Sequence, residues 1–202
     1  EKGASPSEQH IESAPVQTPF SPISVPSRAP RLRLDVAQAA ISLAQRLGLR
    51  VFAQVGSEEE ALEMVRAGAD GIEHGFKTES GSLLAEMAVR GVFFTPTICA
   101  YVRYAPTDVS SVQRTLRRAW ELGVPLVVGT HFPASYGANC GDDIFTEMRM
   151  FEDAGIPRFA VLQAATSGPA RKLGKAEELG RVAPGYHANL VFIRGSADTG
   201  RL

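Results

Sequence analysis

One pattern recurs four times between residues 35 and 129: an amphipathic helix, a glycine, and then a short apolar segment of β-forming residues. The expected helices are 36–46, 58–66, 82–90 and 109–122, and the strands after them are 49–53, 69–73, 92–95 and 125–129. Short, continuously apolar strands that alternate with helices are typical of a parallel sheet covered on both faces. No glycine-rich phosphate loop interrupts the units, so the pattern favours part of an α/β barrel over a dinucleotide-binding fold.

Two of the expected helices begin at residues suited to capping. Asp35 precedes the helix 36–46 and can accept a hydrogen bond from its first turn. Ser57 precedes the helix 58–66, and Glu60 follows three residues later, which is the spacing of a capping box. These residues set the expected starts of the first two helices.

The first thirty residues do not share this pattern. They contain six of the 13 prolines and six serines. Each proline fixes φ and removes a backbone donor, so neither a helix nor a sheet can run through the segment. Residues 1–31 are therefore expected to form a disordered tail, and the chain to start within a longer precursor or to be truncated. The 202 residues are also fewer than the about 250 of a complete barrel.

Composition excludes several classes of function. The net charge is −1, which provides no basic surface for nucleic acid. No apolar stretch approaches the roughly 18 residues of a membrane helix, and the start of the chain does not fit a secretory signal. Two cysteines, Cys99 and Cys140, cannot form a disulfide framework. We therefore expect a soluble protein, cytoplasmic rather than secreted, without a nucleic-acid or membrane partner.

Polar side chains follow the expected strands at the points where these end. Gln54, His74, Thr97 and His131 each lie at or just beyond a strand end, so two of the four histidines of the chain are placed there. In an α/β barrel, ligands bind at the carboxyl ends of the strands. A neutral imidazole is a common zinc ligand. The alternative is that these histidines are bonded to backbone in a packed barrel mouth.

Glu73 directly precedes His74, and alternation along a strand would point the two side chains to opposite faces. Glu73 is therefore expected to pair with a basic group or with backbone near the barrel wall rather than to take part in catalysis.

The segment Gly71–Gly75 (GIEHG) resembles the strand-six signature of the amidohydrolase superfamily, in its imidazolonepropionase-like and prolidase-like branch. Further segments resemble that family in the same order: 126–130, 144–148 around Glu147, 154–157, 164–166, 170–174 and 180–191. The resemblance covers about residues 33–194. It implies a partial TIM-type (β/α) barrel of about strands 5–8 over residues 32–178, followed by a short C-terminal β segment, 179–202, of a companion sandwich.

The resemblance also implies a chemistry. Family members are metal-dependent hydrolases of C–N bonds that hold one or two divalent ions, often zinc, in the barrel mouth. His74 matches the strand-six metal ligand. Gln54 stands where the family has the strand-five histidine, and His131 stands where it has the proton-shuttling aspartate after strand eight. The paired histidines after strand one have no counterpart upstream of Arg33.

These departures weaken the expected site. Gln54 offers only a neutral amide oxygen, and His131 can act as a base but cannot bridge a metal and a water as a carboxylate does. Two histidines fall short of the three protein ligands of catalytic zinc. We therefore expect His131 as the catalytic base, and a weak or absent divalent metal site, zinc by resemblance, at His74 and Gln54.

The family's substrate pocket includes the loop after strand seven. Tyr101, Arg103 and Tyr104 follow the strand 92–95, so the resemblance implies that they contact substrate. Alternatively, these three side chains only cover the barrel mouth.

Three hypotheses on function follow. The first is an amidohydrolase-related protein of the C–N hydrolase lineage, acting on a small amide, cyclic amide or dipeptide-like substrate and inactive or impaired as this chain alone. The second is a non-catalytic half-barrel scaffold that assembles with itself or with a partner chain carrying the other half, because open sheet edges invite pairing. The third is a gene fragment without independent function.

Overall fold

The structure is a computed structural model that describes residues 32–74, 78, 81–104, 108–131 and 140–192. Contacts divide the chain into residues 1–32 and 33–202, and all helices and strands below belong to the second unit. The tail expected over residues 1–31 lies outside the described residues, and the side chains of Arg103, Tyr104 and residues 140–142 do so as well.

Three short parallel strands form the sheet, in the order β1-β2-β3. They are β1 (Phe52–Gln54), β2 (Gly71–Glu73) and β3 (Phe93–Thr95). Each begins later than its sequence pattern suggests, because N–H groups before it donate to a side chain or back to the preceding helix, although the carbonyls of Val51 and Asp70 still accept from the neighbouring strand. For example, the N–H of Val51 donates to the Asp70 carboxylate at 2.7 Å.

The predicted fourth strand, 125–129, is reduced to an isolated parallel bridge between Leu126 and Phe94. The N–H of Phe94 donates to the Pro125 carbonyl, and that of Val127 to the Phe94 carbonyl, both at 2.9 Å. On the other edge, the N–H of Val128 donates to the carbonyl of Ala164, in a helix. A helix end therefore takes the place of a further strand at this edge.

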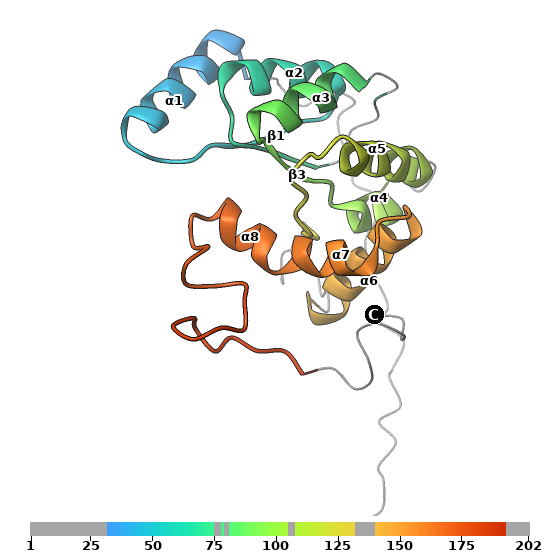
Figure 1. The fold of residues 1–202 in the computed structure, drawn as a ribbon. Coiled ribbons are helices and arrows are strands. Elements are labelled where there is room, and N and C mark those ends of the chain that lie inside the picture. Colours follow the sequence, from blue (N-terminus) through green and yellow to red (C-terminus); the bar gives the residue numbers. More distant parts are fainter. Residues whose placement is uncertain (1–31, 75–77, 79–80, 105–107, 132–139, 193–202) are drawn as a thin grey trace, which may run out of the picture. The chain divides into compact units, whose positions relative to one another are not determined.

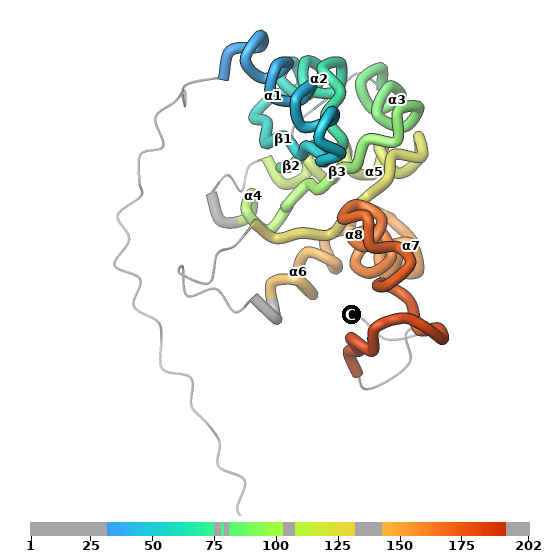
Figure 2. Tube along the Cα trace, turned by 90° about the vertical axis from the view of Figure 1, so that its left-hand side faces the viewer, coloured from blue at the N-terminus to red at the C-terminus, as the bar shows by residue number. Residues whose placement is uncertain are grey.

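Eight helices are seen in the described part of the chain (Figure 1). They are α1 (Leu34–Arg46), α2 (Glu58–Ala67), α3 (Gly81–Arg90), α4 (Ile98–Tyr104), α5 (Val109–Glu121), α6 (Cys140–Asp153), α7 (Arg158–Ala165) and α8 (Ser167–Lys172). Figures 1 and 2 show α1, α2 and α3 together on one side of the strands. Of the four helices predicted by the repeated pattern, all form, and α4 is an addition directly after β3.

The two predicted caps have different outcomes. The Ser57 hydroxyl accepts the N–H of Glu60 at 3.2 Å, which confirms the cap of α2, and the Glu60 carboxylate accepts the N–H of Gly56 at 2.7 Å. The predicted cap by Asp35 is wrong. α1 begins two residues earlier than predicted, at Leu34, and the Asp35 carboxylate binds the Arg33 guanidinium at 2.7 and 3.0 Å instead.

A continuous apolar core lies between the sheet and the helices. Ile72 of β2 and Phe94 of β3 are completely buried. Other fully buried members come from α2, α3, α5 and α6: Val65, Leu84, Met87, Val112, Leu116 and Phe151. Burial of these side chains is the main favourable contribution to folding, and it holds the strand ends in place.

After α8, residues 179–192 form turns, bends and irregular backbone without a strand. The rest of the predicted C-terminal β segment, 193–202, lies outside the described residues, so that segment stays a prediction. In the portions of the chain that can be described, no helix is long and apolar enough to cross a membrane. Cys99 is buried and carries a free thiol.

Candidate functional site

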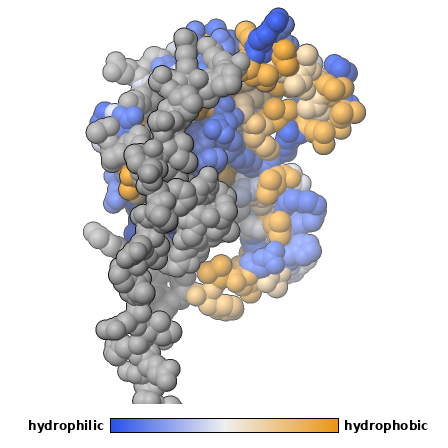
Figure 3. Space-filling view, turned by 180° about the vertical axis from the view of Figure 1, so that it is seen from behind, coloured by the Kyte–Doolittle hydropathy of each residue, from blue (hydrophilic) through white to orange (hydrophobic). Residues whose placement is uncertain are grey.

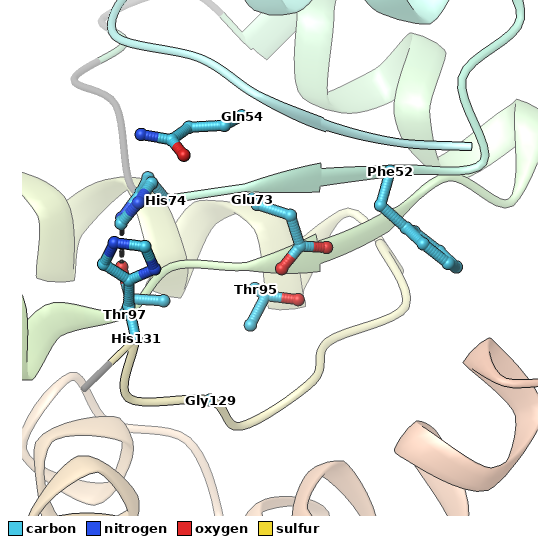
Figure 4. A pocket seen from close by; sticks show the side chains of 8 residues that line it. All are labelled: Phe52, Gln54, Glu73, His74, Thr95, Thr97, Gly129 and His131. Carbon is cyan, nitrogen blue, oxygen red and sulfur yellow. Dashed lines mark hydrogen bonds between the residues drawn. The ribbon is translucent and has the colours of Figure 1, made fainter. Parts of the chain in front are cut away.

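A pocket of about 330 Å³ lies at the carboxyl ends of the strands (Figure 4). Its lining comes from β1, β2, β3 and the segment after Leu126: Phe52, Gln54, Glu73, His74, Thr95, Thr97, Gly129 and His131. The structure therefore brings together the polar strand-end residues that the sequence pattern singled out.

Three residues of this pocket have left-handed backbone conformations. His74 has φ 69°, Thr97 φ 50° and His131 φ 57°, and they are the non-glycine residues with positive φ among those described. Such conformations are unfavourable for residues with a Cβ, most of all for a β-branched one such as Thr97. Residues held in them collect at functional sites. Here all three follow strand ends and line one cavity.

The left-handed turn at His74 also corrects an expectation about Glu73. Alternation along a strand predicts that these neighbouring side chains point to opposite faces, but β2 ends at Glu73 and the chain turns at His74. Both side chains therefore line the same pocket.

The two histidines of the pocket face each other. Their ring centroids are 4.0 Å apart, with an interplanar angle of 75°. The Nδ1 atom of His74 is 2.7 Å from the Thr97 hydroxyl oxygen. Burial lowers the pKa of His74, the nearby His131 lowers it further, and Glu73 partly opposes the shift. Neutral imidazole is therefore favoured at His74, while His131 is exposed at the rim.

Beneath the histidines, an ammonium group from α8 reaches the sheet. Lys172 donates hydrogen bonds to the Glu73 carboxylate and, at 2.8 Å, to the Thr95 hydroxyl. Its Nζ lies 4.7 Å from the centroid of the Phe52 ring, a cation–π arrangement. Glu73 thus pairs with a basic group, as predicted. Sequence reasoning missed Lys172, because no local pattern links residues 99 positions apart.

The predicted substrate-contact residues all lie in α4. Tyr101 packs against the apolar core and is not among the residues that line this pocket. Burial raises the pKa of Tyr101, and the Asp108 carboxylate adds to the shift. The side chains of Arg103 and Tyr104 are outside the described part of the structure, so a substrate role for the three residues stays a prediction.

The donor set fits a divalent metal only in part. His74 and His131 offer two imidazoles, and Gln54 lies exposed at the rim with an amide oxygen. Within the described ranges, no group of three or more His, Cys, Asp or Glu side chains is placed to hold a metal ion. Catalytic zinc takes three protein ligands. Among the described residues, the side chains of this pocket therefore do not make up a complete catalytic zinc site.

Comparison with known proteins places this arrangement in context. The model of a family described as the amidohydrolase family matches residues 21–199. A solved Xaa-Pro dipeptidase with methionine bound in its active site is 24% identical with a TM-score of 0.67, over 79% of this chain and 42% of that chain. No curated protein sequence matches the chain.

Two more solved structures share the fold. The A. niger ochratoxinase is 18% identical with a TM-score of 0.66, over 78% of this chain and 38% of that chain. An adenosine deaminase from Xanthomonas campestris with bound Zn is 19% identical with a TM-score of 0.60, over 78% of this chain and 40% of that chain. The chain thus spans less than half the length of each of the three structures. The predicted fold, part of a TIM-type barrel, is confirmed.

Proposed function

This chain belongs to the amidohydrolase family, and from that premise we propose that its pocket forms part of the site of a metal-assisted C–N bond hydrolase. We further propose that the chain alone has weak or no turnover. The observation that carries the proposal is the convergence of three strained residues, His74, Thr97 and His131, on one cavity at the strand ends. Strain of this kind persists only where the surrounding structure supports it.

Three pocket residues have proposed roles in this chemistry. His74, whose lowered pKa favours the neutral ring, presents a lone pair to a divalent ion, and Gln54 contributes a weaker amide oxygen. His131, exposed at the rim, accepts a proton from water. A divalent ion bound here would lower the pKa of a bound water and polarise a scissile carbonyl. Zinc is the ion we propose, held weakly because the donors are few.

Glu73 is a poor candidate for the base, although it lines the pocket. Its carboxylate is already bonded to the Lys172 ammonium, so it is engaged in an ion pair rather than available to a water molecule. His131 is therefore the proposed proton acceptor. In this assignment the Lys172–Glu73 ion pair has a structural role, and the reacting group is His131 at the rim.

The proposed substrate is a small molecule with an amide-type C–N bond. A cavity of about 330 Å³ is at the small end of ligand pockets. A dipeptide-like molecule is the first choice, since a Xaa-Pro dipeptidase shares the fold. N-acyl amino acids and cyclic amides are the further classes to test.

Metal titration of the metal-free chain tests this proposal. Zn²⁺ is added in competition with a chromogenic chelator, and Xaa-Pro dipeptides and N-acyl amino acids are then assayed for hydrolysis. We expect weak Zn²⁺ binding that His74→Ala abolishes, and little or no turnover. His187→Ala is the matched control, because His187 is an exposed histidine outside the pocket. One tightly held zinc with rapid dipeptide hydrolysis would contradict the proposal that the chain alone has weak or no turnover. Zinc binding that His74→Ala leaves intact would contradict the proposed metal site.

A second candidate function, a half-barrel scaffold, has one observation in its favour. Among the described strands, β1 pairs only with β2, and exposed leucines lie on the adjoining α1 and the turn after it, at Leu43, Leu47 and Leu49. Figure 3 shows hydrophobic atoms gathered over this side of the second unit. An open strand edge and an exposed apolar helix face each favour association. Light scattering of the chain decides: a dimer that Leu43→Glu and Leu47→Glu dissociate supports the scaffold, and a monomer contradicts it.

A further inference from the structure

Glu147, in the middle of α6, is a carboxylate buried in the core. It is 0% exposed, and its two oxygens accept the backbone N–H groups of Ile98 at 2.8 Å and Cys99 at 2.7 Å. Burial raises the pKa of Glu147, and these two hydrogen bonds oppose the shift. A buried carboxylate is costly unless it is fully hydrogen-bonded. Its position therefore calls for an explanation beyond packing.

The two amides belong to the first turn of α4. The first N–H groups of a helix have no partner within the helix. Thr97 directly precedes α4, but its left-handed backbone differs from the extended conformation in which a threonine hydroxyl caps a helix. In this chain the N–H of Cys99 is taken by Glu147, and that of Ala100 donates to the Thr97 carbonyl at 3.0 Å. The Glu147 carboxylate and the Thr97 carbonyl therefore bind the first N–H groups of α4.

The Thr97 hydroxyl contacts a histidine of the pocket. The Thr97 oxygen is 2.7 Å from Nδ1 of His74, and Thr97 is itself buried and left-handed. A partner on one ring nitrogen of a histidine sets the orientation of the ring and leaves the other nitrogen for a metal or a proton. A chain of contacts therefore runs from Glu147 through the start of α4 to Thr97 and His74.

We propose that Glu147 is a positioning residue for His74: by binding the first N–H groups of α4, it holds the adjoining Thr97 in the left-handed conformation in which its hydroxyl orients the imidazole. The proposal deepens the proposed function, since it concerns the same pocket, but the positioning itself does not depend on metal or turnover. Without Glu147, the first turn of α4 loses its acceptors and Thr97 shifts with it, so His74 loses its partner.

The test reads the His74 ring in the metal-free chain. The ¹⁵N chemical shifts of its two ring nitrogens, recorded at about pH 8 where imidazole is neutral, report the tautomer and the hydrogen bond at Nδ1. We expect Thr97→Val to shift the Nδ1 resonance and Thr97→Ser to restore it. Glu147→Ala should produce the same shift as Thr97→Val, and the double variant should shift no further than either single variant.

A control variant on the same helix separates positioning from general loss of structure. Glu152 in α6 binds Arg158 at 2.6 Å, so Glu152→Gln removes an ion pair without touching α4. It should leave the His74 resonances unchanged. If Glu147→Ala does not fold, Glu147→Gln serves, because its amide keeps one acceptor oxygen but turns an NH₂ toward the second N–H.

Two outcomes overturn the proposal. The first is a Glu147 variant that folds and keeps the wild-type His74 resonances, which would make Glu147 a cap of α4 only. The second is a Thr97→Val variant with an unchanged ring. Failure of the proposed function is seen separately, as absence of Zn²⁺ binding by the wild-type chain. If the wild-type chain does bind Zn²⁺, Glu147→Gln should weaken its affinity about tenfold or more.

Discussion

Lys172, the last residue of α8, donates a hydrogen bond to Glu73, the last residue of β2, although 99 positions separate them in the chain. The Lys172 side chain is only 12% exposed. At the same helix end, the Arg50 guanidinium donates to the carbonyl of Lys172 at 2.7 Å. α8 is thereby joined both to the residues before β1 and to the strands beneath the pocket. The pocket floor depends on this connection.

Removing the lysine should destabilise the fold. Lys172→Met leaves the half-buried Glu73 carboxylate without its cation, and we expect the free energy of unfolding to fall by about 2 kcal/mol. Urea unfolding measures the change, and adding Glu73→Gln should recover part of it. Lys175→Met is the control, since the Lys175–Glu178 pair is exposed and should matter little. Equal effects of the two lysine variants would show that burial does not strengthen the Lys172 pair.

Gly129 allows the segment leading to His131 to approach β3 closely. A Cβ at Gly129 would lie 2.8 Å from the Thr95 methyl carbon, and Thr95 is buried and stiff at χ1. Gly129→Ala should therefore lower the free energy of unfolding by about 1–3 kcal/mol and displace His131. Thermal unfolding and the ring contact between His74 and His131, followed by NMR, measure both effects.

Gly81→Ala is the matched control for that substitution. A Cβ at Gly81 meets side-chain atoms of Arg118 and Leu122 at 3.7–3.8 Å, an ordinary contact distance. We expect no loss of stability there. A Gly129→Ala variant as stable as Gly81→Ala would contradict the close approach to Thr95.

The ionisation of His74 should respond to His131. Burial first, and then His131, lower the pKa of His74 from 6.5. A base whose pKa is lowered on folding contributes stability that is fully present above 6.5 and is lost as the pH falls through the folded-state value. His131→Asn removes the like charge, so the His74 pKa should rise and the acid loss of stability should shrink.

An NMR titration of the His74 ring in the metal-free chain measures this change. His187→Asn serves as its control, because His187 is exposed and lies beside Glu178 rather than in the pocket. The interaction between the two pocket histidines is refuted if both variants leave the His74 pKa alike.

Restoring the family's residues should strengthen metal binding. The double variant Gln54→His and His131→Asp would join two better donors to His74, which makes three protein ligands. We expect tighter Zn²⁺ binding than in the wild-type chain, measured by chelator competition. Adding His74→Ala should abolish the gain. An unchanged affinity in the double variant would mean that Gln54 and His131 do not occupy the family's ligand positions.

The repeated helix–glycine–strand pattern was sufficient to predict the four helices, the parallel sheet and the meeting of Gln54, His74 and His131 at one edge. It was sufficient because helical and strand periods are local properties, and because parallel strands end at the same edge of a sheet. Ser57 was predictable for the same reason, since a capping box lies within four residues. The motif around His74 indicated the family before any contact was known.

Tertiary structure alone decided which distant groups complete the site. The contacts of Lys172 with Glu73, of Glu147 with Ile98 and of His74 with Thr97 span 99, 49 and 23 residues. No helical or strand periodicity in the sequence predicts such pairs, because they depend on how the helices and strands pack against one another. The same cause explains two departures. Glu73 and His74 share a pocket because the chain turns left-handed at His74, and the fourth predicted strand keeps one bridge to β3 while Val128, on its other edge, pairs with Ala164 of a helix.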